Sequence, residues 1–513
     1  MATVSADLRI YSVAQVRDIE RAALAELPAG SLMRRAGAAV AETALDMLQA
    51  GDAPVLVLAG PGNNGGDALE AAALLAAAGK AVSVVLLADP QRLASDSKAA
   101  YQHAAEAKVT FIDRFDIAGP WALAIDGLFG IGLTRPLEGP FHAAAEQLNA
   151  LDCAVLSIDV PSGLDADSGM IAGDGIAVHA DRTITFIADK PGLHTAFGRD
   201  HTGEVNVDML GIDPKRYGPP LARRVAPALF ERALPSRTHA SHKGSYGDLT
   251  VIGGAAGMGG AVLLAARMAA MAGAGRVFAA FAAQAPAFDP LHPELMCRNV
   301  DAISLDSGAL VIGPGLGMSR DAADLVGRAL SSSLPLVIDA DALNLIAAES
   351  GLQQRLSRRR ASTVLTPHPL EAARLMGTDA THVQANRISV AAELAARFDA
   401  CVILKGSGSI VAAADGRIAI NTTGNPALAT AGSGDVLSGL CGALLAQGLQ
   451  TWEAALAAVW IHGAAADNMV AEGIGPVGAT ASDLLPYIRA RLNESIVPVV
   501  RSDSIGHSPD SSR

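Results

Sequence analysis

Residues able to exchange protons or hold a cation gather where predicted strands end in the first half of the chain. The apolar run PVLVLAG leads directly into PGNNGGDALE, and later runs end in Asp126 and in Asp159, with Ser162 close behind. A glycine-rich turn at a helix start exposes backbone N–H groups to an anion. We assign Asp159 as a general acid or base, and Asn64, Asp126 and Ser162 as hard oxygen ligands for a cation. Lys190, just past a fifth run, is a second candidate for proton transfer or for holding an anion.

Each of these positions also has a purely structural interpretation. The glycine-rich stretch can be an ordinary strand-to-helix turn, and a carboxylate at a strand tip can form a turn or cap a helix. A single lysine such as Lys190 is more often a solvated surface residue. Because the polar residues occur together on the tips of one predicted sheet, we favour a converging site.

Small residues also precede a helical pattern in the second half. The run TTGNPALATAGSGDVLSGL places Gly432, Ser433, Gly434 and Asp435 immediately before an apolar helix. Amides at that helix start would face a transferring phosphoryl group, while Asp435 would take a proton from a substrate hydroxyl. The structural alternative is an aspartate that caps the helix.

Three other predicted strand ends in this half suit a phosphorylated ligand. LKGSGS offers Lys405 and flexible backbone for a nucleotide phosphate, GPGLG is another anion-tolerant turn, and TPHPLE holds His368 between two prolines. His368 is either a hydrogen-bonding partner of the substrate or a turn residue. No GxxxxGK[ST] occurs, which excludes a P-loop nucleotide site.

The order of the apolar runs predicts the elements that position these residues. In the first half the runs cover residues 54–60, 81–89, 121–130, 153–163 and 182–189, and in the second half residues 248–254, 309–315, 335–341, 362–369 and 400–408. Near-continuous apolar strands separated by helices indicate parallel sheets covered on both faces, which bind ligands outside the carboxyl ends of the strands. We predict two α/β domains with a boundary between residues 211 and 240.

Composition and charge argue against several classes of binding partner and structural site. With 39 Lys and Arg against 52 Asp and Glu among 513 residues, the net charge of −13 disfavours nucleic acid and acidic membrane surfaces. The four cysteines form no CxxC pair, which argues against a zinc cluster or a disulfide framework and fits a reducing cytoplasm. The longest uncharged stretch, residues 249–266, is glycine-rich and stops at Arg267, so we expect no membrane span.

The first-half motifs GPGNNGGDAL, DGLFGIGLTRP, IDVPSGLDAD and the segment beginning at Lys190 resemble the N-terminal domain of the bifunctional NAD(P)H-hydrate repair enzymes over nearly all of residues 1–215. The resemblance implies an epimerase that interconverts R and S hydrates of NADH and NADPH, with a potassium ion held by Asn64, Asp126 and Ser162 and with Asp159 at the substrate. The other substrate contacts it implies are Asn63, Asn64, Gly65, Gly66, Asp67, Gly130, Ile131, Gly132, Leu133, Thr134, Arg135 and Pro136. Ala68 stands where the family commonly has glycine.

The second-half motifs HKGSYGDLTVIGG, GPGLG, TPHPLE, LKGSGS and TGNPALATAGSGDVLSG resemble the ribokinase-like NAD(P)H-hydrate dehydratase domain over roughly residues 225–495. The resemblance implies a bacterial type that uses ADP, with Mg²⁺, and yields AMP and phosphate. It implies that the hydrate is bound by Ala261, Gly317, His368 and Asp435, and the adenylate part by Lys405, Gly406, Ser407, Gly408, Ser409 and Gly434. Leu370 replaces a glycine usual in the histidine motif.

We therefore expect an α/β protein of two three-layer αβα domains, the first Rossmann-like and the second ribokinase-like. The expected division is residues 1–215 for the epimerase, 216–240 for a linker region, 225–500 for the dehydratase and 501–513 for a flexible tail. The alternative is a ribokinase-like kinase of a vitamin or sugar hydroxyl with a ligand-binding N-terminal domain that does no catalysis. We expect a cytoplasmic homo-oligomer whose partners are the hydrates and ADP.

Overall fold

The computed structural model describes residues 8–48, 51, 53–173 and 175–496, so the predicted tail at 501–513 lies outside the described residues. Two compact units divide the chain, one made of residues 1–225 and 367–422 and the other of residues 226–366 and 423–513. Each unit thus contains two separate stretches of sequence. The division into an epimerase at residues 1–215 and a dehydratase at residues 225–500 stays a prediction, and the predicted linker region contains a short strand, β9 (Ala222–Arg224).

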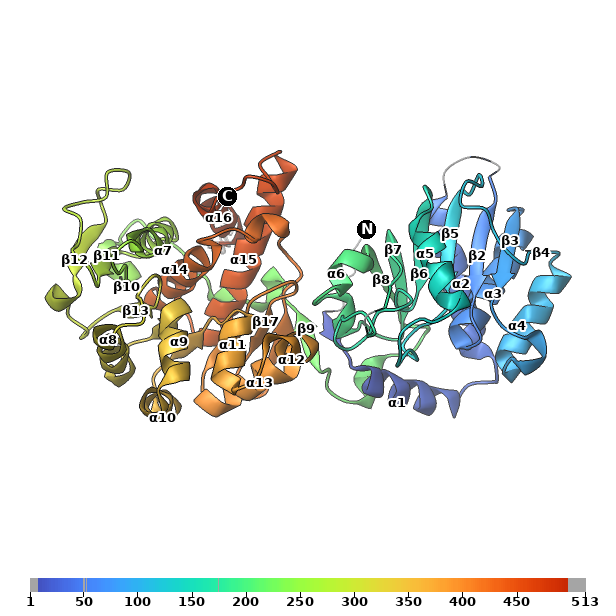
Figure 1. Cartoon of the computed structure of the whole chain (residues 1–513), viewed down its shortest axis with the longest axis horizontal. Helices are drawn as coiled ribbons and strands as arrows, with labels where there is room; N and C mark the ends of the chain where they lie inside the picture. Colours follow the sequence, from blue (N-terminus) through green and yellow to red (C-terminus); the bar gives the residue numbers. More distant parts are fainter. Residues whose placement is uncertain (1–7, 49–50, 52, 174, 497–513) are drawn as a thin grey trace, which may run out of the picture. The chain divides into compact units, whose positions relative to one another are not determined.

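The first unit is built on a seven-stranded parallel sheet with the order β4-β3-β2-β5-β6-β7-β8 (Figure 1). The strands are β2 (Val55–Ala59), β3 (Val82–Leu86), β4 (Thr110–Phe111), β5 (Leu123–Gly127), β6 (Ala154–Ile158), β7 (Arg182–Phe186) and β8 (Glu204–Asp208). All five predicted apolar runs of this half form strands. The chain steps one way from β2 to β4 and the other way from β5 to β8, so the order reverses between β2 and β5.

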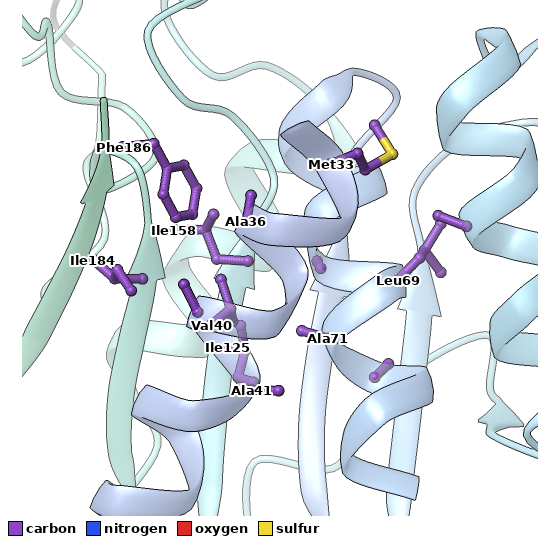
Figure 2. Packing of buried hydrophobic residues seen from close by; sticks show 14 of the residues in the cluster. Met33, Ala36, Val40, Ala41, Leu69, Ala71, Ile125, Ile158, Ile184 and Phe186 are labelled. Atoms are coloured by element: carbon purple, nitrogen blue, oxygen red, sulfur yellow. The ribbon is translucent and has the colours of Figure 1, made fainter. Parts of the chain in front are cut away.

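Helices cover both faces of this sheet because successive side chains of a strand point to opposite faces. Val55 and Val57 of β2 pack with helices α2 (Ser31–Met47), α3 (Asn63–Ala77) and α4 (Ser95–Glu106), whereas Leu56 and Leu58 pack with α5 (Pro140–Asn149). Figure 2 shows the first of these layers, in which Val40 of α2 lies beside Ile125 and Ile158 of the sheet. The three-layer αβα prediction is confirmed here.

The first unit also holds a smaller group of strands. The hairpins of β16 (Cys401–Leu404), β17 (Ile410–Ala412) and β18 (Ile418–Ile420) are antiparallel, β18 runs parallel to β9, and β9 pairs antiparallel with β1 (Arg9–Ile10). The helices outside the large sheet are α1 (Val13–Leu24), α6 (Gly198–His201), α11 (Pro369–Met376), α12 (Ala380–Ala385) and α13 (Arg387–Phe398). Residues 367–422 therefore belong to the same compact unit as the first half of the chain.

The second unit carries parallel strands in the order β15-β14-β13-β10-β11-β12. The strands are β10 (Asp248–Gly253), β11 (Arg276–Phe281), β12 (Met296–Asn299), β13 (Ala309–Ile312), β14 (Leu336–Ile338) and β15 (Thr363–Leu365), and the helices are α7 (Gly259–Met271), α8 (Arg320–Ser331), α9 (Ala340–Ala348), α10 (Ser350–Arg358), α14 (Ser433–Ala446), α15 (Thr451–Ala471) and α16 (Ala481–Ser495). The strand order reverses between β10 and β13. Crossovers between parallel strands are right-handed, so α7 and α8 lie on opposite faces.

Among the residues that the structure describes, no helix combines the length and the apolar character that a crossing of the bilayer needs.

Candidate functional site

The first candidate site lies where the strand order of the first unit reverses, at the carboxyl ends of β2 and β5. The two strands approach so closely that a Cβ added at Gly60 would lie 1.9 Å from the carbonyl oxygen of Leu128, and one at Gly65 would lie 2.0 Å from the oxygen of Gly60. Only glycine fits both positions. The reversal point of a parallel sheet is where such folds bind ligands.

The predicted anion turn differs from the structure at its helix end. We predicted that residues 62–67 precede the helix, but α3 begins at Asn63 with Gly62 as its N-cap. Asn63, Asn64, Gly65, Gly66 and Asp67 therefore form the first turn and a half of α3. Close packing on Gly60 overrides the low helix propensity of asparagine and glycine. Ala68, which replaces a family glycine, is fully buried, and a Cβ at Gly127 would lie 2.4 Å from its methyl group.

Asp126 and Ser162, predicted to share a cation, are in direct contact. The Ser162 hydroxyl donates to Asp126 Oδ1 at 2.6 Å, and the Ser162 amide donates to Oδ2 at 2.9 Å. Ser157 and the Leu128 amide donate to the same carboxylate. Burial raises the pKa of Asp126, although these hydrogen bonds oppose the shift. Asn64 is also buried, and its Nδ2 atom has no hydrogen-bond partner among the described residues.

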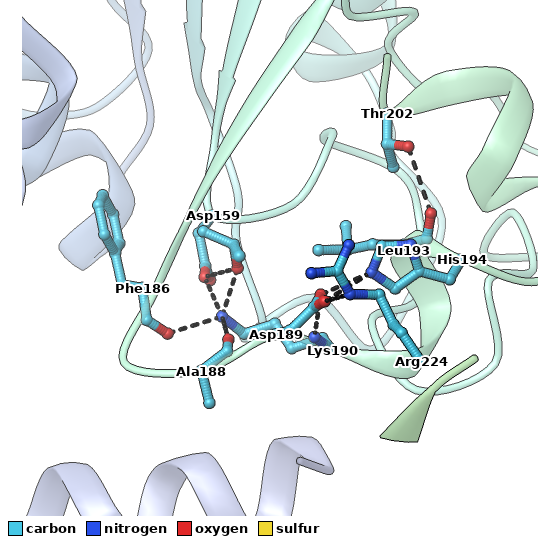
Figure 3. A network of polar contacts seen from close by, with 10 residues as sticks. Asp159, Phe186, Ala188, Asp189, Lys190, Leu193, His194, Thr202 and Arg224 are labelled. Atoms are coloured by element: carbon cyan, nitrogen blue, oxygen red, sulfur yellow. Dashed lines mark hydrogen bonds and ion pairs between the residues drawn. The ribbon is translucent and has the colours of Figure 1, made fainter. Parts of the chain in front are cut away.

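Asp159 and Lys190 form a buried ion pair beside this cluster (Figure 3). The lysine Nζ donates to Asp159 Oδ1 at 2.8 Å, to the Thr185 hydroxyl at 2.5 Å and to the carbonyl oxygens of Phe186 and Ala188. Lys190 has no exposed surface, so the interpretation as a solvated surface lysine is wrong. Asp159 holds its backbone at a φ of +67°.

The substrate loop predicted at residues 130–136 meets the ion pair at its first residues. The Ile131 amide donates to Asp159 Oδ2 at 2.9 Å, and a Cβ at Gly130 would lie 2.5 Å from that oxygen and 3.1 Å from Asn64 Oδ1. Glycine at position 130 thus allows the loop backbone to pack closely against both polar side chains. Thr134 and Arg135 lie further along the loop and are exposed, and their contact with substrate stays a prediction.

Two further acidic residues, Asp67 and Glu20, interact electrostatically with Asp159. Burial, Asp159, Glu20 and Glu70 raise the pKa of Asp67 well above its usual value. Burial and Asp159 raise the pKa of Glu20, while Lys190 and Arg17 oppose that shift. Sequence reasoning missed Glu20 and the Lys190 partner Thr185. Glu20 lies on α1, more than a hundred residues from Asp159, and no local motif marks it.

A second network lies next to Lys190 in the chain (Figure 3). Asp189 accepts hydrogen bonds from its neighbour's amide at 2.8 Å and pairs with His194 at 2.7 Å and Arg224 at 3.2 Å. Burial raises the pKa of Asp189, but His194 and Arg224 lower it more, so the net shift is downward. This network fixes the backbone on both sides of the lysine.

The second candidate site lies at the corresponding reversal point of the second unit. A Cβ at Gly253, which ends β10, would lie 1.9 Å from the carbonyl oxygen of Pro314, which follows β13. Gly317 in the next turn donates its amide to Asp341 Oδ2 at 2.8 Å, and a Cβ at Gly315 would lie 3.2 Å from that of Ala261. The structure therefore places Ala261 beside the predicted GPGLG turn.

Asp435 lies inside helix α14, and not before the helix or at its N-cap as the two interpretations required. Helix α14 starts at Ser433 with Gly432 as its N-cap at a φ of +91°, so Gly434 and Asp435 are the second and third residues of the helix. The capping interpretation of Asp435 is therefore wrong. Gly432 lies against Leu264, and Gln447 at the far end donates to the Ala272 carbonyl at 3.0 Å. Helices α7 and α14 therefore run side by side in the same direction, with their N-termini at one end.

His368 and the 405–409 loop belong to the first unit. His368 is the N-cap of α11, and its Nδ1 accepts hydrogen bonds from the amides of Leu370 at 3.1 Å and Glu371 at 3.3 Å. The Leu370 departure therefore leaves the cap intact. The Nζ atom of Lys405 lies 3.9 Å from Oε2 of Glu371. Because Ala261, Gly317, Gly434 and Asp435 belong to the other unit, convergence of the two groups on one ligand stays a prediction.

Within the described residues, no three His, Cys, Asp or Glu side chains are grouped as a metal site. A cation at Asn64, Asp126 and Ser162 would instead bind carbonyl and hydroxyl oxygens around one carboxylate. The Ser162 hydroxyl lies 3.1 Å from the Phe129 carbonyl as well as 2.6 Å from Asp126. One negative charge among neutral oxygens suits a monovalent hard cation.

Comparison with known proteins matches both halves. Residues 29–192 match a family described as YjeF-related protein N-terminus, and residues 249–489 match one described as NAD(P)H-hydrate dehydratase. The bifunctional NAD(P)H-hydrate repair enzyme Nnr of Coxiella burnetii is 38% identical over 94% of this chain and 99% of its own length. This chain belongs to the bifunctional NAD(P)H-hydrate repair enzyme family. The enzyme of the same name from Escherichia coli is 35% identical over 88% of each chain.

Among solved structures, the ADP/ATP-dependent NAD(P)H-hydrate dehydratase of Bacillus subtilis, co-crystallised with ATP and Mg²⁺, is 29% identical and covers 53% of this chain and 98% of its own, with a TM-score of 0.47. Family membership confirms the predicted pair of activities, an epimerase and a dehydratase, which are an isomerase and a lyase. It rules out the alternative hypothesis, a vitamin or sugar kinase whose first domain does no catalysis.

Proposed function

We propose that the Asp159–Lys190 pair transfers the protons of hydrate epimerisation. The hydrates differ at a ring carbon that carries a hydroxyl and neighbours the ring nitrogen. Inverting that carbon requires its C–O bond to break and to reform on the other face. Lys190 would protonate the departing oxygen and Asp159 would take the proton back from the returning water. The observation that carries this proposal is the 2.8 Å ion pair, buried beside the strand reversal point, past the ends of β6 and β7.

The hydrate would lie against the first turn of α3 and the 130–136 loop. Gly130 supports this placement, since it lets the backbone of this loop approach both Asn64 and Asp159 closely. Potassium would be held by Asn64, Asp126 and Ser162, and its charge would anchor an oxygen of the hydrate. The unpartnered Asn64 amide supports this assignment, because a half-turn of the amide exchanges its nitrogen for an oxygen.

For the second activity, we propose ADP-dependent dehydration of the S hydrate, with Mg²⁺ accompanying the nucleotide. Asp435 takes the proton of the ring hydroxyl, whose oxygen attacks the terminal phosphorus of ADP and displaces AMP. The phosphate then leaves the ring while the neighbouring carbon loses a proton, which restores NADH or NADPH. Phosphate leaves far more readily than hydroxide. The position of Asp435 in the first turn of α14, behind a left-handed glycine, supports this role.

Incubation with a mixed R and S hydrate, ADP and Mg²⁺ tests both activities. The expected result is restored absorbance of the reduced nicotinamide ring, with AMP and phosphate released in equal amounts and both hydrates consumed. A stable phosphorylated hydrate would contradict the elimination step. Persistence of the R form would contradict the epimerase assignment.

The potassium assignment has its own test. Epimerisation should be faster in K⁺ than in Na⁺ at equal ionic strength, and Ser162→Ala should remove most of that difference. Equal rates in the two salts for the unmodified protein would contradict a potassium site. We further propose a cytoplasmic location, which suits cysteines that form no disulfide among the described residues, and a homo-oligomer, which suits the exposed Phe288 and Leu291.

A further inference from the structure

The loop proposed to bind the adenylate part of ADP is held by residues from the first half of the chain. The Thr195 hydroxyl lies within hydrogen-bond distance of the carbonyl oxygens of Ser407, at 3.1 Å, and Gly408, at 3.3 Å, and the Ala196 amide donates to the Ser407 oxygen at 3.1 Å. These contacts join residues more than two hundred positions apart within one compact unit. They bind the loop through its backbone, which leaves its side chains available.

Arg387, the first residue of α13, completes this support. Its Nε donates to the Thr195 hydroxyl at 2.9 Å, and its Nη2 reaches the carbonyl oxygens of Lys405 at 3.2 Å and Gly408 at 3.3 Å. Arg387 is only 2% exposed, Thr195 is fully buried, and burial lowers the pKa of the arginine to about 10. The Thr195 hydroxyl therefore accepts from the arginine and donates to the loop.

The loop also fits sterically against the Thr195 segment. Gly408 adopts a φ of +63°, and a Cβ there would lie 1.9 Å from the His194 carbonyl oxygen and 2.7 Å from the Thr195 Cα. The Thr195 segment is rigid in turn, since His194 is paired with Asp189 and a Cβ at Gly169 would lie 2.1 Å from the Thr195 carbonyl oxygen. The backbone of the loop is therefore restricted to this conformation where it contacts the Thr195 segment.

We propose that Thr195 and Arg387 are positioning residues that hold the 405–409 loop in its nucleotide-binding conformation, so that the first half of the chain sets the ADP affinity of the dehydratase. This inference rests on the proposed assignment of that loop to ADP. Neither residue takes part in a chemical step. When a binding-competent state is only partly populated, the apparent dissociation constant rises by the inverse of its population. Loosening the loop should therefore raise KM for ADP and leave kcat largely unchanged.

The test compares full-length variants in steady-state dehydration of the S hydrate. Thr195→Val keeps the shape of the side chain but leaves the Nε of Arg387 without its acceptor, and it should raise KM for ADP by a factor of about 5 to 30. Thr195→Ser restores the hydroxyl and should return KM close to that of the unmodified protein. Epimerisation should stay unchanged in both.

The second unit supplies a matched control. Arg359 is 6% exposed, donates from Nε to the Thr363 hydroxyl at 2.9 Å and contacts the Leu330 and Ser332 carbonyl oxygens. Thr363→Val removes the same kind of hydroxyl from the same kind of buried arginine, and none of these contacts involves a residue of the 405–409 loop. It should lower the melting temperature and leave KM for ADP unchanged. An equal rise of KM in Thr363→Val would overturn the proposal, because general destabilisation would then explain the effect.

A further variant separates this inference from the proposed function. Lys405→Met alters the loop itself and should raise KM for ADP. If Lys405→Met raises KM and Thr195→Val does not, the positioning role alone is wrong. If ADP supports turnover but neither variant changes KM, the loop is not the nucleotide site and both proposals are wrong.

A measurement on the unmodified protein avoids any folding defect of the variants. The Ala196 amide should exchange its hydrogen more slowly when ADP is added, since a bound nucleotide would hold the Ser407 carbonyl in place. The Ile112 amide, which bonds to Val84 at the far edge of the large sheet, serves as the control. Unchanged exchange at Ala196 under saturating ADP would overturn the proposal.

Discussion

The two strand reversal points have the same backbone packing but differ in the side chains assigned to chemistry. At both, a glycine at the end of one strand lies against a carbonyl oxygen that follows its neighbour, Gly60 against Leu128 and Gly253 against Pro314. In the first unit the assigned groups are buried side chains, above all Asp159 and Lys190. In the second they are largely backbone amides and small residues. Proton transfer needs titratable groups, whereas phosphoryl transfer needs positioned donors, so one scaffold serves two chemistries.

The largest effect should come from removing the carboxylate of the first site. Asp159→Asn keeps the shape of the side chain but cannot take up a proton, and it deprives the buried Lys190 of its opposite charge. Epimerisation should fall by about 10²- to 10⁴-fold, the usual contribution of a general acid or base. Dehydration of pure S hydrate should be unaffected. The measurement is R to S interconversion followed by chromatography.

The ion pair between the buried Asp289 and Arg267 in the second unit supplies the control, with hydrogen bonds of 2.6 and 2.8 Å. Asp289→Asn should destabilise the protein without slowing epimerisation. If Asp159→Asn epimerised at the unmodified rate, Asp159 would be a binding residue and Lys190 the better candidate for proton transfer.

The carboxylate of the second site should give the next largest effect. Asp435→Asn should lower dehydration by roughly 10²-fold or more, while ADP binding and epimerisation persist. The cost in stability should be small, about 0.3 to 1 kcal/mol, because Asp435 is a first-turn acid and not the cap of α14. Calorimetry with ADP and a dehydration assay measure the two properties separately.

Asp321, in the first turn of α8, is the matched first-turn acid outside the assigned site. Asp321→Asn should cost a similar free energy and leave dehydration unchanged. A fully active Asp435→Asn enzyme, or one that no longer binds ADP, would contradict the catalytic role and weaken the contrast between the two sites.

The smallest predicted effect is on the pH dependence of folding stability. It tests the electrostatic difference between the two sites, because Asp67 is a buried acid of the first site. The pKa of Asp67 is raised in the folded state, so the folded protein retains a proton that the unfolded chain loses above about pH 4. The stability that this group contributes is therefore lost as pH rises from the unfolded pKa towards the folded pKa. Asp67→Asn should match the unmodified protein near pH 4 and become progressively more stable than it towards pH 7. Melting curves across this range would reveal the divergence, and parallel curves would contradict it.

Much of the first site could be predicted because its signals are local. Apolar runs identified the strands. Asp126 lies near the end of β5, and Asp159 and Ser162 follow β6, its neighbour in the sheet. Burial was not predictable in the same way. Lys190 reads as an ordinary lysine, yet its ammonium is enclosed by Asp159, Thr185 and two carbonyl oxygens that converge only in the fold.

Element boundaries and long-range contacts were the weakest predictions. Asparagine and glycine favour turns, which moved the predicted starts of α3 and α14 past their true positions. Strands β8 and β11 went unpredicted, one half-exposed and the other alanine-rich. The contact between Thr195 and Ser407 joins residues that no window of local sequence contains together.

The left-handed backbone of Asp159 has a consequence for laboratory evolution. A side chain at positive φ is disfavoured by roughly 1–2 kcal/mol, and glycine avoids that cost. A library screened for heat resistance alone should therefore enrich Asp159→Gly together with Lys190→Met, which removes both the strained side chain and the buried charges. A library screened for survival under accumulating hydrates should discard the same pair. Opposite enrichment in the two screens would identify Asp159 as a position where selection for catalysis acts against selection for folding.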